Sequence, residues 1–229
     1  MGYNSERSKE RILNAAERLF SAHGIDGVSV RQIAAAAGVQ LALLTYYFGT
    51  KVGLYRAVFE RRIAPISAAR RARLAAILRR KRPPPRIDEV LDALARPWVE
   101  LRRHRWGAHY TRLIAREVSD PREGRRGIVE DLLDPIAREF MAAMEQTLPG
   151  LPRARIQWAY HFFIGALLMI LLHPRRPQRL SGNLCKVDDN EALLGEIIGF
   201  FTTALRDKAR QRQKTKSRRN AYEAGDLHA

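Results

Sequence analysis

The apolar residues of this chain recur at helical spacing along nearly its whole length. In the first such stretch, residues 5–22, apolar side chains lie three and four positions apart: Ile12, Ala15, Ala16, Leu19 and Phe20. This spacing places them on one face of an α-helix. No run of strictly alternating polarity, the pattern typical of a strand, interrupts the sequence. The pattern therefore predicts an all-α fold.

Two short helices are predicted next, with a sharp turn between them. Ser29 and Gln32 form the ends of a Ser-x-x-Gln capping box, so a helix begins directly after Ser29. Gly38 allows the positive φ of a tight exit, and another short helix covers about residues 40–47. Thr50 is placed to cap a fourth helix. Short helices joined by a tight turn, with a helix before them, have the spacing of a helix-turn-helix.

The same periodicity predicts five longer helices in the rest of the chain. They cover about residues 88–104, 106–118, 125–147, 153–172 and 188–211. Pro65 is expected to kink or end the fourth helix. With about nine helices in total, the expected organisation is a helix-turn-helix domain over 1–62, a second helical domain over 63–211 and a basic, disordered tail over 212–229.

Charge adds a polyanionic partner to this picture. The 229 residues include 41 Lys or Arg and 24 Asp or Glu, which gives a net charge of +17. A positive charge of this size indicates a polyanionic partner. The helix-turn-helix spacing predicts that this partner is double-stranded DNA. Eight basic residues lie between Arg70 and Arg86, and eight more between Arg206 and Arg219. For both groups a solvated surface is favoured over an additional DNA contact.

The sequence lacks the patterns typical of an enzyme, a metal site or a membrane-spanning helix. The single cysteine, Cys185, can form no internal disulfide and fits a reducing, cytoplasmic setting. No nucleophile, base and orienting acid stand at a readable spacing, so no catalytic residue, cofactor or metal ligand is expected. The most apolar stretch, residues 158–172, contains His161 and is shorter than the ~20 residues needed to cross a bilayer. It is predicted to be a buried helix.

Residues 12–55 resemble one protein family specifically. The run reads ILNAAERLFSAHGIDGVSVRQIAAAAGVQLALLTYYFGTKVGLY, and it closely resembles the DNA-binding domain of the TetR family of one-component transcriptional regulators. The resemblance implies an all-helical homodimer whose C-terminal domain binds a small molecule. We therefore expect a repressor that an unidentified small-molecule effector releases from a palindromic operator. A ligand-independent dimeric DNA-binding protein and an activator are the alternatives.

The resemblance also implies DNA-contacting positions. The recognition helix would carry Gln40, Leu41, Ala42, Thr45 and Tyr46. Tyr46 and Lys51 match positions that contact phosphates in the family, and Ser29 matches a helix cap that does so too. Where the family frequently has Ser-Lys-Gly-Thr, this chain has Gln-Leu-Ala-Leu from position 40. Base readout is therefore expected to rely on Gln40, Thr45 and apolar contacts to thymine methyls, while Leu43 packs inward.

The second domain contains aromatic and polar side chains of the kind that line a ligand cavity. They are Trp98, Trp106, His109, Tyr110, Trp158, His161, Phe162 and Met169. Plain core packing is the alternative for each of them, so no effector can be named. A solid apolar core formed by Trp106, Tyr110 and Trp158 would favour the ligand-independent protein.

The last two long helices are the expected dimer interface, because together they carry more apolar surface than one inward face requires. Gly195 and Gly199 lie four positions apart, where each costs about 1 kcal/mol relative to Ala. A closely approaching helix of a partner would explain both glycines. The expected interface residues are Leu194, Gly195, Ile198, Gly199, Phe201 and Leu205. Packing within the subunit alone is the alternative.

Overall fold

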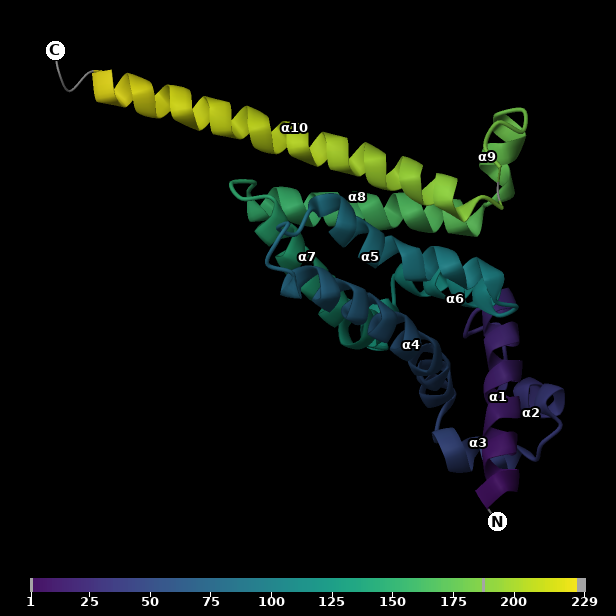
Figure 1. The fold of residues 1–229 in the computed structure, drawn as a ribbon. Coiled ribbons are helices and arrows are strands. Elements are labelled where there is room, and N and C mark those ends of the chain that lie inside the picture. The colour runs from purple at the N-terminus through teal and green to yellow at the C-terminus, as the bar shows by residue number, and fades with distance from the viewer. Residues whose placement is uncertain (1, 187, 226–229) are drawn as a thin grey trace. The chain divides into compact units, whose positions relative to one another are not determined.

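The computed structural model describes residues 2–186 and 188–225, with side chains for 5–186 and 188–209. Within these ranges all regular structure is helical, which confirms the predicted all-α fold (Figure 1). The chain forms two compact units. The first contains Met1–Ala69 and Glu100–Ile136, and the second contains Arg70–Val99 and Ala137–Ala229.

The first unit holds the N-terminal helices together with a segment from the middle of the chain. Its α-helices are α1 (Gly2–His23), α2 (Val30–Ala37), α3 (Leu41–Phe48), the first part of α4 (Lys51–Arg79) and α6 (Gly107–Val118). Short turns η1 (Leu101–Arg103), η2 (Glu123–Arg125) and η3 (Val129–Leu133) complete it. The helices predicted near 5–22, 40–47 and 106–118 are confirmed to within a few residues.

Helix α4 continues through Pro65, where the sequence predicts a kink or an end. A proline inside a helix removes one backbone hydrogen bond and crowds the preceding turn. Here Pro65 lies on the exposed side of the helix, while Ile63 and Ile66 are buried on either side of it. Burial of these two side chains holds the helix together across the proline, so the local signal is overridden by packing.

Four aromatic rings form the centre of the first unit. Phe20 of α1 meets Tyr55 of α4 edge to face, with ring centroids 5.0 Å apart. Tyr55 packs on Phe59 at 5.1 Å, and Phe59 packs on Tyr110 of α6 at 6.1 Å. Because this core joins α1, α4 and α6, residues that the sequence assigns to the second domain pack with the helix-turn-helix.

A carboxylate without exposed surface lies beside this core. Glu117 of α6 accepts a hydrogen bond from the Tyr55 hydroxyl at 3.1 Å and another from Arg126 Nε at 3.0 Å. Arg126 also pairs with Asp120 at 2.9 Å. Burial, together with the negative charge of Glu117, raises the pKa of Tyr55 well above its usual value. The phenol therefore stays protonated and keeps donating to Glu117.

The second unit contains the remainder of α4 and most of the C-terminal helices. They are α5 (Ile87–Glu100), α7 (Asp134–Thr147), α8 (Arg153–Leu172), α9 (Arg175–Leu180) and α10 (Asn190–Gly225). Helices α8 and α10 pack side by side (Figure 1). The short α9 was not predicted, and α10 extends past its predicted end at 211. The side chains of the predicted basic tail, 212–229, lie outside the described residues.

The basic residues between Arg70 and Arg86, at the end of α4 and in the turn before α5, serve the packing of the second unit. Arg70 is buried, donates to the Leu94 carbonyl at 2.9 Å and lies 5.0 Å from the centroid of the Trp98 ring. Other members of the segment form ion pairs: Arg71 with Glu139, Arg80 with Glu89 and Arg86 with Asp88. These contacts favour the structural interpretation of the segment over an extended DNA contact.

Replacing Glu117 by Gln should lower the free energy of unfolding by about 3 kcal/mol, because Arg126 then loses part of its buried compensation. Arg153→Gln is the matched control, since Arg153 pairs with Glu145 on the exposed surface and should contribute less than about 1 kcal/mol. Urea unfolding of the two variants followed by circular dichroism provides the measurement. An equal loss in the free energy of unfolding for both variants would show that the buried Glu117 contributes no more to stability than an exposed ion pair.

Candidate DNA-binding site

Helix α2 begins at a fully formed capping box. Ser29 has an extended backbone, with φ −91° and ψ 153°, and its Oγ accepts from the Gln32 N–H at 3.2 Å. In return, the Ser29 N–H donates to Gln32 Oε1 at 2.8 Å. These bonds satisfy two amides at the start of the helix. The predicted cap is confirmed, and Ser29 lies exposed at the N-terminus of α2.

The turn between α2 and α3 is fixed by a glycine and by an arginine from α1. Gly38 has φ +62°, in the left-handed region that side chains disfavour. Arg11 donates through Nε to the Ala37 carbonyl at 2.8 Å and through Nη2 to the Gly38 carbonyl. The guanidinium thereby satisfies carbonyls at the end of α2 and ties the turn to α1. Arg11 escaped sequence analysis because it lies 26 residues before Ala37.

Helix α3 buries one side and exposes the other. Leu44 is buried and Leu43 is half-buried, while Tyr47 reaches α1, where its hydroxyl lies 2.7 Å from Ser5 Oγ. The residues predicted for the recognition surface are all exposed: Gln40, Leu41, Ala42, Thr45 and Tyr46. A short helix that packs on the protein with one face and exposes the opposite face can enter a DNA major groove, which is about as wide as a helix.

The N-terminus of α4 brings a cation to the start of α2. Thr50 Oγ1 accepts from the Gly53 N–H at 3.0 Å, which confirms the predicted cap. Lys51 is half-buried, and its ammonium donates to the Val28 carbonyl at 3.2 Å. An ammonium group has three N–H donors, so this bond leaves two for another acceptor. Because Val28 directly precedes Ser29, the structure brings Lys51 and the cap of α2 together.

The residues predicted to line an effector cavity are divided between the two units. In the first unit, the Arg62 guanidinium lies 4.0 Å from the centroid of the Trp106 ring, and Ser21 Oγ lies 3.1 Å from His109 Nδ1. Tyr110 is fully buried in the aromatic core. Each of these residues therefore contacts α1 or α4, the helices that precede α2 and follow α3 in the chain.

The predicted cavity residues of α8 are exposed in the second unit. Trp158, Phe162 and Met169 have 63%, 60% and 53% of their surface exposed, and His161 is exposed too. In this unit these side chains are therefore exposed rather than enclosed. Helix α8, which was predicted to be a buried helix, buries one face only: Ile156, Ala159, Phe163, Leu167 and Leu171. Trp98 of α5, by contrast, is buried. By length and composition alone, α8 is also apolar enough to cross a membrane.

The predicted dimer-interface residues fall into two groups. Leu194 and Leu205 are buried within the second unit, and Phe201 packs on Phe163 with ring centroids 5.1 Å apart. The other group faces outward or borders a groove: Gly195, Ile198 and Gly199. Phe200, which was not predicted, is 72% exposed. It was missed because its neighbour Phe201 completes the apolar stripe that faces inward.

This geometry defines the chain as a helix-turn-helix DNA-binding protein with a helical C-terminal domain. In the described part of the chain, no three His, Cys, Asp or Glu side chains gather where a metal could bind.

A family model described as bacterial regulatory proteins, tetR family, matches residues 12–58. A second, described as tetracyclin repressor-like, C-terminal domain, matches residues 92–204. The chain belongs to the TetR family of transcriptional regulators, which confirms the resemblance.

Individual relatives agree with this assignment. The HTH-type transcriptional dual regulator CecR of Shigella flexneri is 40% identical over 57 residues, which are 25% of each chain. The HTH-type transcriptional regulator YttP of Bacillus subtilis (strain 168) is 45% identical over 47 residues, 20% of this chain and 23% of that one. The chain thus matches about a quarter of the length of these relatives.

A solved structure extends the likeness to the whole fold. The fatty acid degradation regulator FadR from Bacillus halodurans superimposes with a TM-score of 0.62 over 87% of this chain and 96% of its own. The two sequences are 19% identical, so the likeness concerns the fold alone.

Lys51→Ala should weaken binding to all DNA sequences about equally and reduce the slope of log affinity against log salt by about one, because one phosphate contact is lost. Gln40→Ala should instead change the preference among sequences, because Gln40 lies where α3 would meet base edges. Fluorescence anisotropy with a panel of duplexes at several salt concentrations separates the two effects. The role assigned to Lys51 is wrong if its removal alters only sequence preference.

Proposed function

We propose that this protein is a homodimeric repressor that binds a palindromic operator and leaves it when a small molecule binds the C-terminal domain. The observation that carries the proposal is the uncovered face of α3 beside the capped start of α2 and the Lys51 ammonium. A net charge of +17 supports a polyanionic partner.

On DNA, the two kinds of contact would come from different parts of this surface. Gln40 and Thr45 can hydrogen-bond base edges in the major groove, and Leu41 can contact thymine methyl groups. The Tyr46 hydroxyl and the Lys51 ammonium are donors suited to phosphate oxygens, and the N-terminus of α2 at Ser29 favours an anion through its free amides. Phosphate contacts of this kind set the position of the head, while the base contacts select the sequence.

Dimerisation would use the apolar surface that α8 and α10 leave uncovered. Trp158, Phe162 and Met169 on α8 and Phe200 on α10 are each more than half exposed, which is unusual for large apolar side chains of a monomer. Two helices from each subunit would form a four-helix bundle, and the two-fold axis of such a dimer requires inverted half-sites in the operator. Contact with a second subunit, rather than with a membrane, would thus account for the apolar character of α8.

Release would pass through α6, because several polar contacts attach that helix to α1 and α4. Arg116 donates to the Ser21 and Ala22 carbonyls of α1 at 3.0 and 2.8 Å, and Glu117 accepts from Tyr55 of α4. A ligand that binds better when α6 is displaced would therefore change the separation of the two heads. By linkage, the ligand would weaken DNA binding by the same factor by which DNA weakens ligand binding.

A solid core shared by Trp106, Tyr110 and Trp158 would favour the ligand-independent alternative. Trp106 and Tyr110 belong to the first unit, whereas Trp158 is exposed on the second, so neither unit contains such a core. An activator would use the same DNA-binding surface and differ only in where its operator lies.

The double variant Phe162→Glu/Phe200→Glu should sediment as a monomer and bind an operator at least about 10²-fold more weakly, because a single head loses the second half-site. Leu184→Glu is the matched control, since Leu184 is 86% exposed in the turn before α10 and lies outside the proposed interface. Sedimentation velocity and titration with a duplex selected by the parent protein give both readouts. A double variant that sediments as an intact dimer removes this interface from the proposal.

A further inference from the structure

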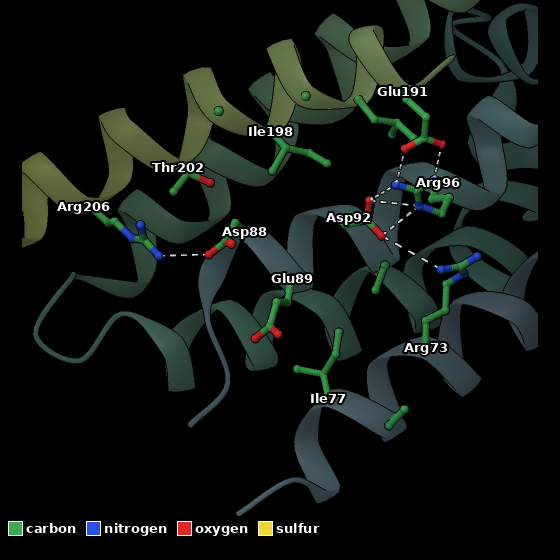
Figure 2. A pocket seen from close by; sticks show the side chains of 15 residues that line it. Arg73, Ile77, Asp88, Glu89, Asp92, Arg96, Glu191, Ile198, Thr202 and Arg206 are labelled. Carbon is green, nitrogen blue, oxygen red and sulfur yellow. Dashed lines mark hydrogen bonds and ion pairs between the residues drawn. The ribbon is translucent and has the colours of Figure 1, made fainter. Parts of the chain in front are cut away.

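A groove of about 750 Å³ lies within the second unit between α4, α5 and α10 (Figure 2). Its apolar lining includes Ile77 of α4, Ala93 of α5 and Leu194 and Ile198 of α10. Gly195 and Gly199 of α10 also line the groove, and apart from the neighbouring backbone of α10 no atom lies within 4 Å of where a Cβ would stand on either. The volume falls in the range of small-molecule sites in proteins, about 300–1,000 Å³.

Every charged side chain that lines this groove already has an oppositely charged partner. Arg96 joins Asp92 at 2.8 Å and Glu191 at 2.5 Å, and Arg206 joins Asp88 at 2.9 Å (Figure 2). The remaining pairs are Glu89 with Arg80 at 2.7 Å and Arg73 with Asp92 at 4.0 Å. A charged ligand would have to displace one of these partners to form an ion pair of its own, whereas an uncharged ligand would leave all of the pairs in place. The groove therefore favours an uncharged molecule.

One uncharged polar side chain of the lining is buried without a hydrogen-bond partner. Thr202 is only 7% exposed, and its Oγ1 has no hydrogen-bond partner among the described residues. Figure 2 shows its side chain on the same side of α10 as that of Ile198, toward the groove. A threonine in a helix has two accessible rotamers, so its hydroxyl and methyl group can exchange places. The hydroxyl can thus meet a polar atom placed in the groove.

We propose that this groove binds a neutral, elongated apolar molecule with one hydroxyl or carbonyl group, which hydrogen-bonds Thr202. The ends of the groove are marked on α10 by Glu191 and Arg206, which at ~1.5 Å per residue lie about 22 Å apart. An extended hydrocarbon chain fits this length, and its methylene groups would contact the apolar lining and the two glycines. Such a ligand would be the effector of the proposed repressor. That regulatory role rests on the proposed function, whereas the binding does not.

Isothermal titration with three probes of equal chain length tests the ligand class. 1-Decanol should saturate one site per chain, and decanoate and decylammonium should bind at least about tenfold more weakly because each carries a charge. Thr202→Val should weaken 1-decanol binding about fivefold, and Thr202→Ser, which keeps the hydroxyl, should restore it. Equal affinity for the charged probes, or parental affinity in Thr202→Val, would overturn the proposal.

Filling the groove tests its location. Ala76 lines the groove on the exposed surface of α4, so Ala76→Phe should abolish 1-decanol binding while circular dichroism shows the helical content of the parent. Ala72→Phe is the matched control one turn away, because Ala72 is exposed and does not line the groove. Parental binding by Ala76→Phe would place the site elsewhere. The titrations contain no DNA, so failure to bind an operator contradicts only the proposed function, and failure to bind 1-decanol only the groove assignment.

Discussion

The buried carboxylate of Glu117 is the constraint on which the first unit depends. It has no exposed surface, so its charge must be compensated inside the protein, and the compensation comes from Tyr55 of α4 and from Arg126 in the segment after α6. Any displacement of α6 separates at least one of these groups from the carboxylate. The helix-turn-helix is therefore attached to a helix that the sequence places in a different domain.

Local signals were sufficient to predict most helices. The capping box at Ser29 and the left-handed Gly38 depend only on neighbouring residues, and the bounds of α8 match the prediction from periodicity. Contacts between distant segments were not visible in the sequence. Helix α4 passes Pro65 because Ile63 and Ile66 are buried by other parts of the unit, and the Arg11 bonds to the α2 turn span more than 25 residues.

Periodicity shows how many faces of a helix are apolar, but it does not show which face turns inward. On α10 the predicted interface residues Leu194 and Leu205 pack inside the unit, while Phe200, which was not predicted, is exposed. On α8 nearly every position is apolar, so the exposed set of Trp158, Phe162 and Met169 could not be separated from its core neighbours. The exposed positions of α3 were easier to predict, because the family resemblance assigns them position by position.

The most direct test of the account is selection of duplexes from a random-sequence pool by the full-length protein, followed by sequencing of the bound fraction. Two identical heads related by a two-fold axis should enrich an inverted repeat whose half-site centres lie about one helical turn, ~34 Å, or a multiple of it, apart. Enrichment of a direct repeat or of a single half-site, or no enrichment at all, would contradict a symmetric dimer that reads DNA through α3.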